Sequence, residues 1–439
     1  MAFDALISAA TGDLHQGSGA SRTVSGIMMR LRPVVGLLAG LVVMSSSAAM
    51  AQGVSAADAK LHARLLTLDT HLDTPANLER GGFDIMRAHP EQGPFSQVDV
   101  PRMRAGGLDG GFWVIFTPQG PLTAAGYAAS RDTAIGRAVK IREMVAANPK
   151  TFVLATKADE AASIAASGKI IVYQSIENSY PLGEDISLLK TFYGLGVRMA
   201  SPVHTLNNQF GDSATDPVKR WNGLSPLGQA WLEEANRLGI IVDGSHASDD
   251  VIDQLVAQSK TPIILSHHGA KAVFAHPRNL DDERLKKVAA SGGVIQINSL
   301  YVAPTTTTPE FRTMQGALRA RLAKWSQLTP AERTALSKEI ADLDTAYPNW
   351  RASFEDVMAN LLHVLKLVGP DHVGLGADWD GGGGVKGMES VADLPKITAR
   401  LRAAGYSEAD LQKIWSGNLL RLLTQADAYR ESLATAQGK

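Results

Sequence analysis

Short apolar runs recur along the chain after about residue 60, and stretches with helical periodicity separate them. The runs 239–242 and 261–265 are apolar almost throughout, which is typical of parallel strands that are covered on both faces. Between the runs, 226–238 has apolar residues at helical spacing, and 249–258 and 281–290 each follow a polar start that can cap a helix. The predicted strands are Leu65–His71, Phe112–Thr117, Ile170–Glu177, Val197–His204, Ile240–His246, Pro262–His268, Gly293–Ser299 and Val373–Asp378.

Strand and helix alternating eight times predict an α/β fold, a (β/α)8 TIM barrel. One long interruption, 305–350, falls between strands 7 and 8 and is charged and rich in Ala and Leu. Because structureless loops of this length are uncommon in compact domains, we predict a helical insertion there. It is either a lid over the barrel mouth or a surface hairpin with no role at the site. Residues 52–439 then form a single barrel domain.

The first 51 residues are predicted to be a signal peptide with an upstream extension. Met28–Arg32 supplies a positive flank, Val34–Met44 is an apolar stretch of 11 residues, and Ala49–Ala51 has the small-x-small pattern of a cleavage site. A bilayer span needs roughly 20 apolar residues, so the stretch is too short to cross a membrane. The alternative is a buried core helix. Cleavage near Ala51 would leave a mature protein that is periplasmic or secreted.

Composition excludes some partners and some chemistry. The formal net charge of the 439 residues is -1 and no Lys/Arg-rich run stands out, so nucleic acid and acidic membrane surfaces are not expected partners. The chain has no cysteine, which excludes a thiolate metal ligand, a cysteine nucleophile and disulfides. Any metal must therefore bind His, Asp and Glu side chains.

Chemically capable residues occur where the predicted strands end. The C-terminal ends of barrel strands meet at one mouth, where active sites of this fold lie. A lone strand-end histidine is more often structural than a ligand, but six of the eight predicted strands end in such residues. Since a buried acid or imidazole is costly unless it is paired or binds an ion, this convergence predicts a metal site. The residues are His71, Asp73, Glu177, His204, His246, His267, His268, Asp378 and Asp380.

The ligand types indicate the metal and the reaction. Mixed nitrogen and oxygen donors favour zinc, with manganese or iron as alternatives. Four His or carboxylate ligands and one bridging carboxylate fit two ions better than one, and such ions lie about 3.5–4 Å apart. Zinc can lower the pKa of its bound water to about 7, so a metal-activated hydroxide is available at neutral pH. The sequence therefore predicts a hydrolase.

These motifs resemble those of the membrane (renal) dipeptidase family, zinc peptidases of the amidohydrolase-like barrel group. The similarity covers nearly all of the mature chain, in order and in spacing. It is carried by Asp69–Asp73, Glu177–Asn178, Leu206–Asn208, Asp243–His246, Ser266–Ala270, Pro277–Leu280, Gly374–Gly381 and Gly417–Arg421.

The resemblance implies two zinc ions per chain and a ligand set. His71 and Asp73 would bind one ion, His246 and His267 the other, and Glu177 would bridge them. His267 is followed by His268 where relatives often have a small residue, so the assignment could shift by one position.

The resemblance also implies roles in catalysis and substrate binding. Asp378 would be the general acid/base, with Asp380 as the alternative. His204 would polarise the scissile carbonyl and stabilise the developing oxyanion. Arg278 would anchor the free C-terminal carboxylate of the substrate, unless it is an exposed arginine in a salt bridge.

The resulting expectation is a dipeptidase whose partners are small dipeptides, including those with a D-residue at the second position. The alternative is another metal-dependent amidohydrolase, acting on N-acyl amino acids, β-lactams or lactones. A third alternative, a non-catalytic binding protein, would lack a ligand or the proton-handling residue. The family resemblance implies a homodimer. Because the chain ends in Thr435–Lys439 with no apolar tail, we expect no stable membrane anchor.

Overall fold

The structure, a computed structural model, describes residues 54–89, 96–322, 324 and 327–437. The predicted signal peptide and its cleavage site lie outside these residues. All strand pairs between named strands of the described part are parallel. The strands are β1 Leu68–Leu72, β2 Gly110–Phe116, β3 Phe152–Leu154, β4 Ile170–Glu177, β5 Val197–Ala200, β6 Ile241–Val242, β7 Ile264–His268, β8 Val294–Ile297 and β9 Val373–Leu375.

The strands form two sheets whose edges meet. One sheet has the order β1-β2-β4-β5-β6, with β3 paired to β4, and the other has the order β7-β8-β9. Isolated parallel bridges join Leu72 to Trp379 and Asp243 to Ile264. They connect both edges of one sheet to the edges of the other. The fold is therefore mixed α/β with a curled parallel sheet, whose strand ends point toward one side.

Each of the eight predicted runs overlaps an observed strand, but the predicted bounds are partly wrong: β1 extends to Leu72 and β2 begins at Gly110, both outside the predicted runs. The run predicted for 240–246 shrinks to the two residues of β6, because the chain turns immediately afterwards and His246 has a left-handed φ of 68°. β3 was missed, since three residues pairing only with β4 are too few to show a periodic pattern. All eight residues of β4 are buried, as expected for a strand covered on both faces.

Helix boundaries follow local chemistry. α7 begins after Ser225, whose side chain accepts a hydrogen bond from the Gly228 N–H, and ends at Gly239 with a left-handed φ of 73°. The predicted helices in 226–238, 249–258 and 281–290 correspond to α7, α8 and α9. The helices are α1 Ala56–His62, α2 Pro75–Leu78, α3 Val100–Ala105, α4 Ala124–Ala147, α5 Glu160–Ala166, α6 Leu188–Leu195, α7 Pro226–Leu238, α8 Asp249–Gln258, α9 Asp282–Ala290, α10 Pro309–Leu322, α11 Pro330–Ala346, α12 Phe354–Val368, α13 Pro395–Ala403, α14 Glu408–Gln412 and α15 Asn418–Gln437.

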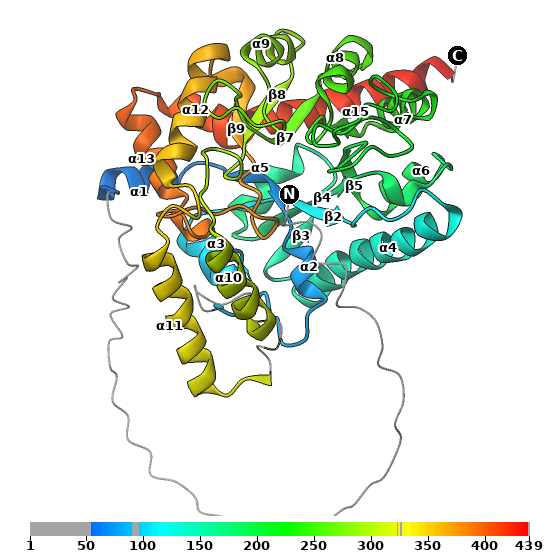
Figure 1. Cartoon of the computed structure of the whole chain (residues 1–439). Coiled ribbons are helices and arrows are strands. Elements are labelled where there is room, and N and C mark those ends of the chain that lie inside the picture. Colours follow the sequence, from blue (N-terminus) through cyan, green and yellow to red (C-terminus); the bar gives the residue numbers. More distant parts are fainter. Residues whose placement is uncertain (1–53, 90–95, 323, 325–326, 438–439) are drawn as a thin grey trace, which may run out of the picture. The chain divides into compact units, whose positions relative to one another are not determined.

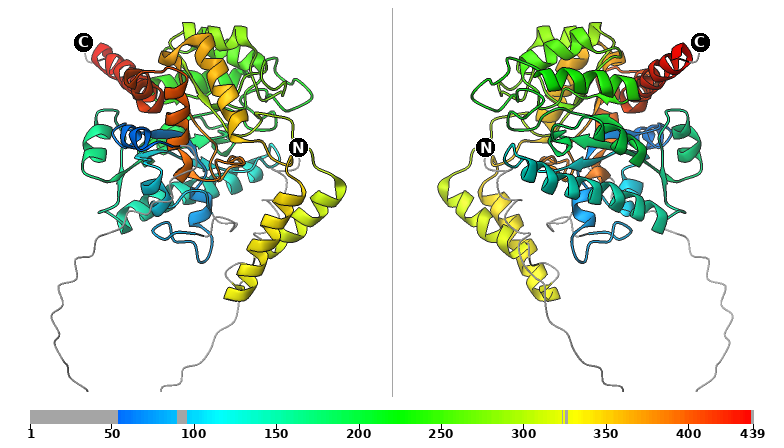
Figure 2. Two further views of the ribbon diagram at one scale, coloured as in Figure 1. Left: turned by 90° about the vertical axis from the view of Figure 1, so that its left-hand side faces the viewer. Right: turned by 90° about the vertical axis from the view of Figure 1, so that its right-hand side faces the viewer.

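Helices α10 and α11 occupy most of 305–350, between β8 and β9, and extend away from the strands (Figures 1 and 2). They share a small apolar core, in which Leu318 and Leu336 are buried and Leu322, Ile340 and Leu343 pack against them. None of the helices in the described ranges is long and apolar enough to cross a bilayer.

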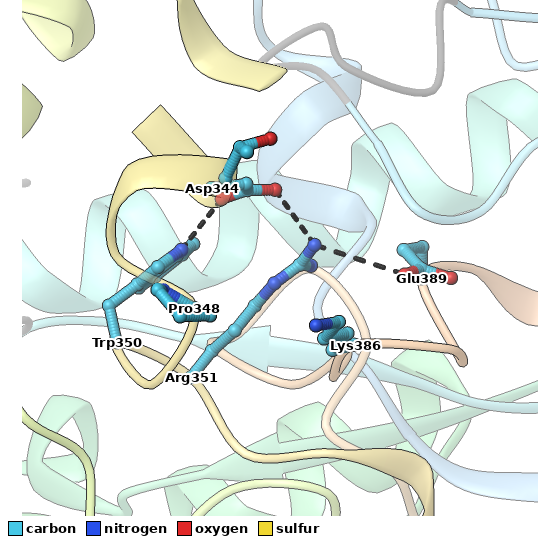
Figure 3. Close-up of a pocket in the computed structure, with 7 residues that line it drawn as sticks. Asp344, Pro348, Trp350, Arg351, Lys386 and Glu389 are labelled. Atoms are coloured by element: carbon cyan, nitrogen blue, oxygen red, sulfur yellow. Dashed lines mark hydrogen bonds and ion pairs between the residues drawn. The ribbon is translucent and has the colours of Figure 1, made fainter. Parts of the chain in front are cut away.

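The base of this helical pair is attached to the loop that follows β9. Arg351 donates to Asp344 at 2.9 Å and lies 3.8 Å from Glu389, and the Trp350 indole also donates to Asp344 at 2.6 Å (Figure 3). A cavity of about 330 Å³ lies among these residues and Lys386. The insertion and the segment after the eighth predicted strand are thus held together at this point.

Candidate metal centre

Strand-end residues from four parts of the chain converge on the carboxylate of Glu177. His71 Nε2 lies 3.4 Å from Glu177 Oε2. The other oxygen, Oε1, lies 3.0 Å from His246 Nε2, 3.4 Å from His267 Nε2 and 3.7 Å from His204 Nε2. One oxygen of this carboxylate therefore faces the His71 imidazole, and the other faces three further imidazoles.

A second carboxylate group lies beside His71. Asp73 Oδ2 is 3.4 Å from His71 Nε2, and potential ligand atoms of His71, Asp73 and Asp378 lie within 4.8 Å of one another. Gly381 packs against the oxygens of Asp73 and Asp378 so closely that a Cβ at this position would overlap both. The structure thus brings together all three residues, which come from the ends of β1 and β9.

The donor atoms fit a metal ion. The Nδ1 atoms of His71 and of His246 are buried and have no hydrogen-bond partner in the described structure. His246 Nε2 and His267 Nε2 lie 2.9 Å apart. Buried polar atoms without partners are costly, and two imidazole lone pairs this close repel each other unless a proton or a cation lies near both. Imidazole nitrogens around a carboxylate are the ligands that zinc and related divalent ions accept.

Three of the histidines at the site have the protonation state that a metal ligand needs. Burial, with a further contribution from the Arg278 charge, lowers the pKa of His204 to about 3 and the pKa of His246 and His267 well below the usual range. These imidazoles are therefore neutral and keep a free lone pair, which metal binding requires.

The pKa values of His71 and of two carboxyl groups near it shift in the opposite direction. Burial alone would lower the pKa of His71, but the nearby charges of Glu177 and Asp73 outweigh it and raise that pKa. Burial raises the pKa of Glu177 and of Asp378, and His71 opposes both shifts. Burial thus disfavours the ionised form of these two carboxylates, and a divalent cation bound beside them would stabilise that form.

The backbone is strained where the site residues leave the strands. Asn178, His246 and Asp378 have φ values of 66°, 68° and 63°, in the left-handed region that non-glycine residues rarely adopt. Such conformations typically cost about 1–3 kcal/mol each and cluster at functional sites. Here they turn side chains at strand ends toward a common centre.

The geometry favours His267 over His268 as the ligand. His267 Nε2 faces Glu177 and His246, as described above. His268 instead directs Nδ1 to Arg278 Nη1, at 3.3 Å, and belongs to none of the three groups of potential ligands found among the described residues.

Asp378 and Asp380 are distinguished in the same way. The carboxylate of Asp380 accepts hydrogen bonds from the hydroxyls of Thr74 and Ser96, both at 2.7 Å, and from the Gln97 N–H at 2.6 Å. Asp380 is thus occupied in holding loops together, whereas Asp378 lies with His71 and Asp73 in one of the groups of potential metal ligands.

Arg278 is buried, with 2% exposure, rather than exposed in a salt bridge. Its Nη2 donates to the His267 carbonyl at 3.1 Å, and its Nε has no hydrogen-bond partner. Within the described part of the chain, no carboxylate lies at ion-pair distance from this guanidinium. A buried cation without an anion is unfavourable, so Arg278 is prepared to bind an anionic group from outside the chain.

Aromatic residues around the site were missed by the sequence analysis. The Phe116 ring lies 4.7 Å from the His204 ring, and the Arg278 guanidinium lies 5.9 Å from the Tyr301 ring, which stacks on His276 at 4.2 Å. Phe116 ends β2 and could have been found by its position. Tyr301 and His276 lie in loops, where the pattern gives no signal.

The chain is similar to known dipeptidases. It is 32% identical over 348 residues to dipeptidase aclJ of Aspergillus oryzae, which covers 77% of this chain and 72% of that protein. The probable dipeptidase PvdM from Pseudomonas aeruginosa has 29% identity and a TM-score of 0.72, covering 85% of this chain and 98% of that one. A metallopeptidase from Rhodobacter sphaeroides, solved with a phosphinate mimic of the dipeptide L-Ala-D-Ala, shares the fold at 24% identity and a TM-score of 0.64, covering 82% and 99%.

The family match extends over nearly all of the chain that follows the predicted signal peptide. The model of the family "membrane dipeptidase (peptidase family M19)" matches residues 56–437. These residues include every member of the site described above. The chain therefore belongs to the membrane dipeptidase family and is a metal-dependent dipeptidase.

Proposed function

We propose that this chain hydrolyses dipeptides with two zinc ions bound at the centre around Glu177. In this proposal His71 and Asp73 hold one ion, His246 and His267 hold the other, and Glu177 bridges them. The observation that carries the proposal is the division of the Glu177 carboxylate, whose Oε2 faces His71 while Oε1 faces His246 and His267. When bound, the zinc ions supply a water of lowered pKa as the nucleophile.

The chain's own residues would bind the substrate and move protons. Arg278 binds the C-terminal carboxylate, which provides the anion that its buried guanidinium lacks. His204, neutral and next to Glu177, donates a hydrogen bond to the oxygen of the scissile carbonyl as negative charge develops there. Asp378, which lies beside His71 and Asp73, accepts the proton of the attacking water and delivers it to the leaving amine.

The anchor explains why the substrate would be a dipeptide. Arg278 donates to the carbonyl of His267, so it is fixed next to one of the proposed ligands. In this proposal a carboxylate held there lies one residue away from the scissile bond, as the C-terminal carboxylate of a dipeptide does. We propose that a D-residue is accepted at this second position, by analogy with the Rhodobacter sphaeroides metallopeptidase and its L-Ala-D-Ala mimic.

The test combines metal analysis with a substrate panel. The purified protein is expected to contain two zinc ions per chain and to cleave L,L- and L,D-dipeptides, but not tripeptides, N-acyl amino acids, β-lactams or lactones. Asp378→Asn should abolish turnover and retain both ions, since Asp378 handles the proton. Equal activity on tripeptides, or preferential hydrolysis of a lactone or an N-acyl amino acid, would contradict the proposal.

We also propose that strands β1, β2 and β4–β9 close into a (β/α)8 barrel, with the insertion 305–350 between the seventh and eighth of these strands. The bridges from Leu72 to Trp379 and from Asp243 to Ile264 support closure. An experimental structure with continuous pairing at both bridges is the expected result. Open sheet edges at either bridge would refute closure.

Export is a further proposal, supported by the order of positive flank, apolar stretch and cleavage site in residues 28–51. Expression of the full chain in a bacterium should give a periplasmic or secreted protein whose N-terminus is Gln52. Full-length protein in the cytoplasmic fraction would refute this.

A further inference from the structure

Two buried carboxylates next to the metal centre do not face it. Asp69 is fully buried within β1, and Asp243 has 3% exposure directly after β6. Neither forms an ion pair with another described residue, and neither belongs to a group of potential metal ligands there. Since a buried carboxylate is costly, its hydrogen bonds indicate what it does.

Asp243 connects the segments that carry His246 and His267. Its Oδ1 accepts from the backbone N–H of Ser245 and of Ser266, both at 2.9 Å. Its Oδ2 accepts from the Ser266 hydroxyl at 2.6 Å. The Ser245 hydroxyl in turn accepts the His267 N–H at 3.1 Å. One carboxylate thereby fixes the residues immediately before both histidines.

The same network determines the tautomer of His267. Ser266 Oγ lies 2.9 Å from His267 Nδ1, and a hydroxyl has only one proton. Because the Ser266 hydroxyl donates its proton to Asp243 Oδ2, Ser266 Oγ must accept from His267 Nδ1–H. His267 Nε2 is then unprotonated, and its lone pair faces Glu177, as a metal ligand requires.

Asp69 has the corresponding position on the other side of the centre. Its Oδ1 accepts the His71 N–H at 2.8 Å. Its Oδ2 accepts the Ala377 N–H and the Trp379 indole N–H, both at 3.1 Å. Asp69 thus ties the backbone of His71 to the two residues that flank Asp378.

We propose that Asp69 and Asp243 are positioning residues, each for one of the two metal positions. Asp243 orients His246 and His267 and sets the His267 tautomer, and Asp69 orients His71 relative to Asp378. The inference rests on the proposed function, because it assigns each carboxylate to one zinc ion. Partners of metal ligands typically change metal affinity by about 10–100-fold when they are removed.

The experiment compares Asp243→Asn and Asp69→Asn with the wild-type chain, labelled with ¹⁵N-histidine. Without metal, His267 should be protonated at Nδ1 in the wild type and lose this preference in Asp243→Asn, but not in Asp69→Asn. On zinc titration, Asp243→Asn should weaken binding about 10–100-fold at His246 and His267 while the His71 signals still shift at the wild-type concentration. Asp69→Asn should show the reverse.

Asp212→Asn is the matched control. Asp212 is also buried and accepts three backbone N–H groups, from Arg220, Trp221 and Gly223, but it contacts no proposed ligand. This variant should lose stability and bind both ions as the wild type does. If Asp243→Asn does not fold, Ser266→Ala removes the same relay and should give the same change in the His267 tautomer.

The outcomes separate the two ideas. Suppose that the wild type binds two ions. If each variant then weakens zinc binding equally at both positions, or at neither position, the assignment of one carboxylate to each position is wrong and the proposed function stands. If the wild type does not bind two ions, the two-zinc proposal is wrong. The metal-free spectrum still tests the relay in that case, and an unprotonated Nδ1 of His267 in the wild type would overturn it.

Discussion

Replacing Arg278 by methionine tests the proposed substrate anchor directly. The guanidinium is buried and has no carboxylate partner among the described residues, so its anion has to come from the substrate. Methionine has a similar length, but it removes the charge and all of the donors. The variant should therefore lose affinity for substrates with a free C-terminal carboxylate.

The size of the effect follows from the hydrogen bonds lost. A hydrogen bond to a charged group contributes about 1.5–3 kcal/mol, and a guanidinium can donate two in parallel to one carboxylate. A loss of about 3–4 kcal/mol corresponds to a decrease in kcat/KM of about 10²–10³-fold. Steady-state kinetics on a dipeptide and on its C-terminal amide would measure this. The amide should be affected much less, so the preference for the free acid should disappear.

Stability should change in the opposite direction. The free protein carries a buried charge without a partner, so Arg278→Met should unfold at a higher urea concentration than the wild type. The control is Arg102→Met, since Arg102 is also buried but lies 2.8 Å from the buried carboxylate of Asp99. Breaking that pair should cost about 3–5 kcal/mol of stability and leave kcat/KM of the folded enzyme unchanged.

Two results would refute the reasoning. If Arg278→Met keeps the wild-type preference for the free acid over the amide, Arg278 does not bind the carboxylate. If Arg278→Met and Arg102→Met destabilise the protein equally, the charge of Arg278 is paired in the free protein.

Three further predictions follow from the site and its surroundings. Dialysis against a zinc chelator should abolish dipeptide hydrolysis and lower the Tm, and added zinc should restore both; activity that survives complete metal removal would contradict this. Gly381→Ala should lower zinc affinity, measured by titration, because its Cβ would overlap the oxygens of Asp73 and Asp378; unchanged affinity would show that the loop can move aside. Burial lowers the pKa of His62 in the folded state below its ordinary 6.5, so the unfolded chain takes up a proton more readily and His62 stabilises the fold less as pH falls below about 6.5. Urea unfolding from pH 5 to 8 should therefore show a flatter pH dependence for His62→Gln than for the wild type, and an equally steep dependence would contradict the assignment.

The sequence by itself determined the order of the elements and the residues available for chemistry. Uninterrupted apolar runs and helical spacing are local properties, so β4 and α7 could be predicted with their observed bounds. The polar residues at the strand ends could also be read from the sequence. Their convergence could be expected, because parallel strands bring their C-terminal ends to one side of the sheet. This was enough to identify His71, Glu177 and His246 as a possible metal site.

Only the tertiary structure decided where the side chains point. Asp380 and Asp378 are two positions apart in the chain, yet Asp380 is bound by Ser96 and Gln97, almost 300 positions away. The burial of Arg278 without an anion is likewise a property of the packed site. The physical reason is that periodicity and capping depend on neighbours in the chain. The direction of a side chain after a strand depends instead on left-handed turns and hydrogen bonds that exist only once distant segments have packed together.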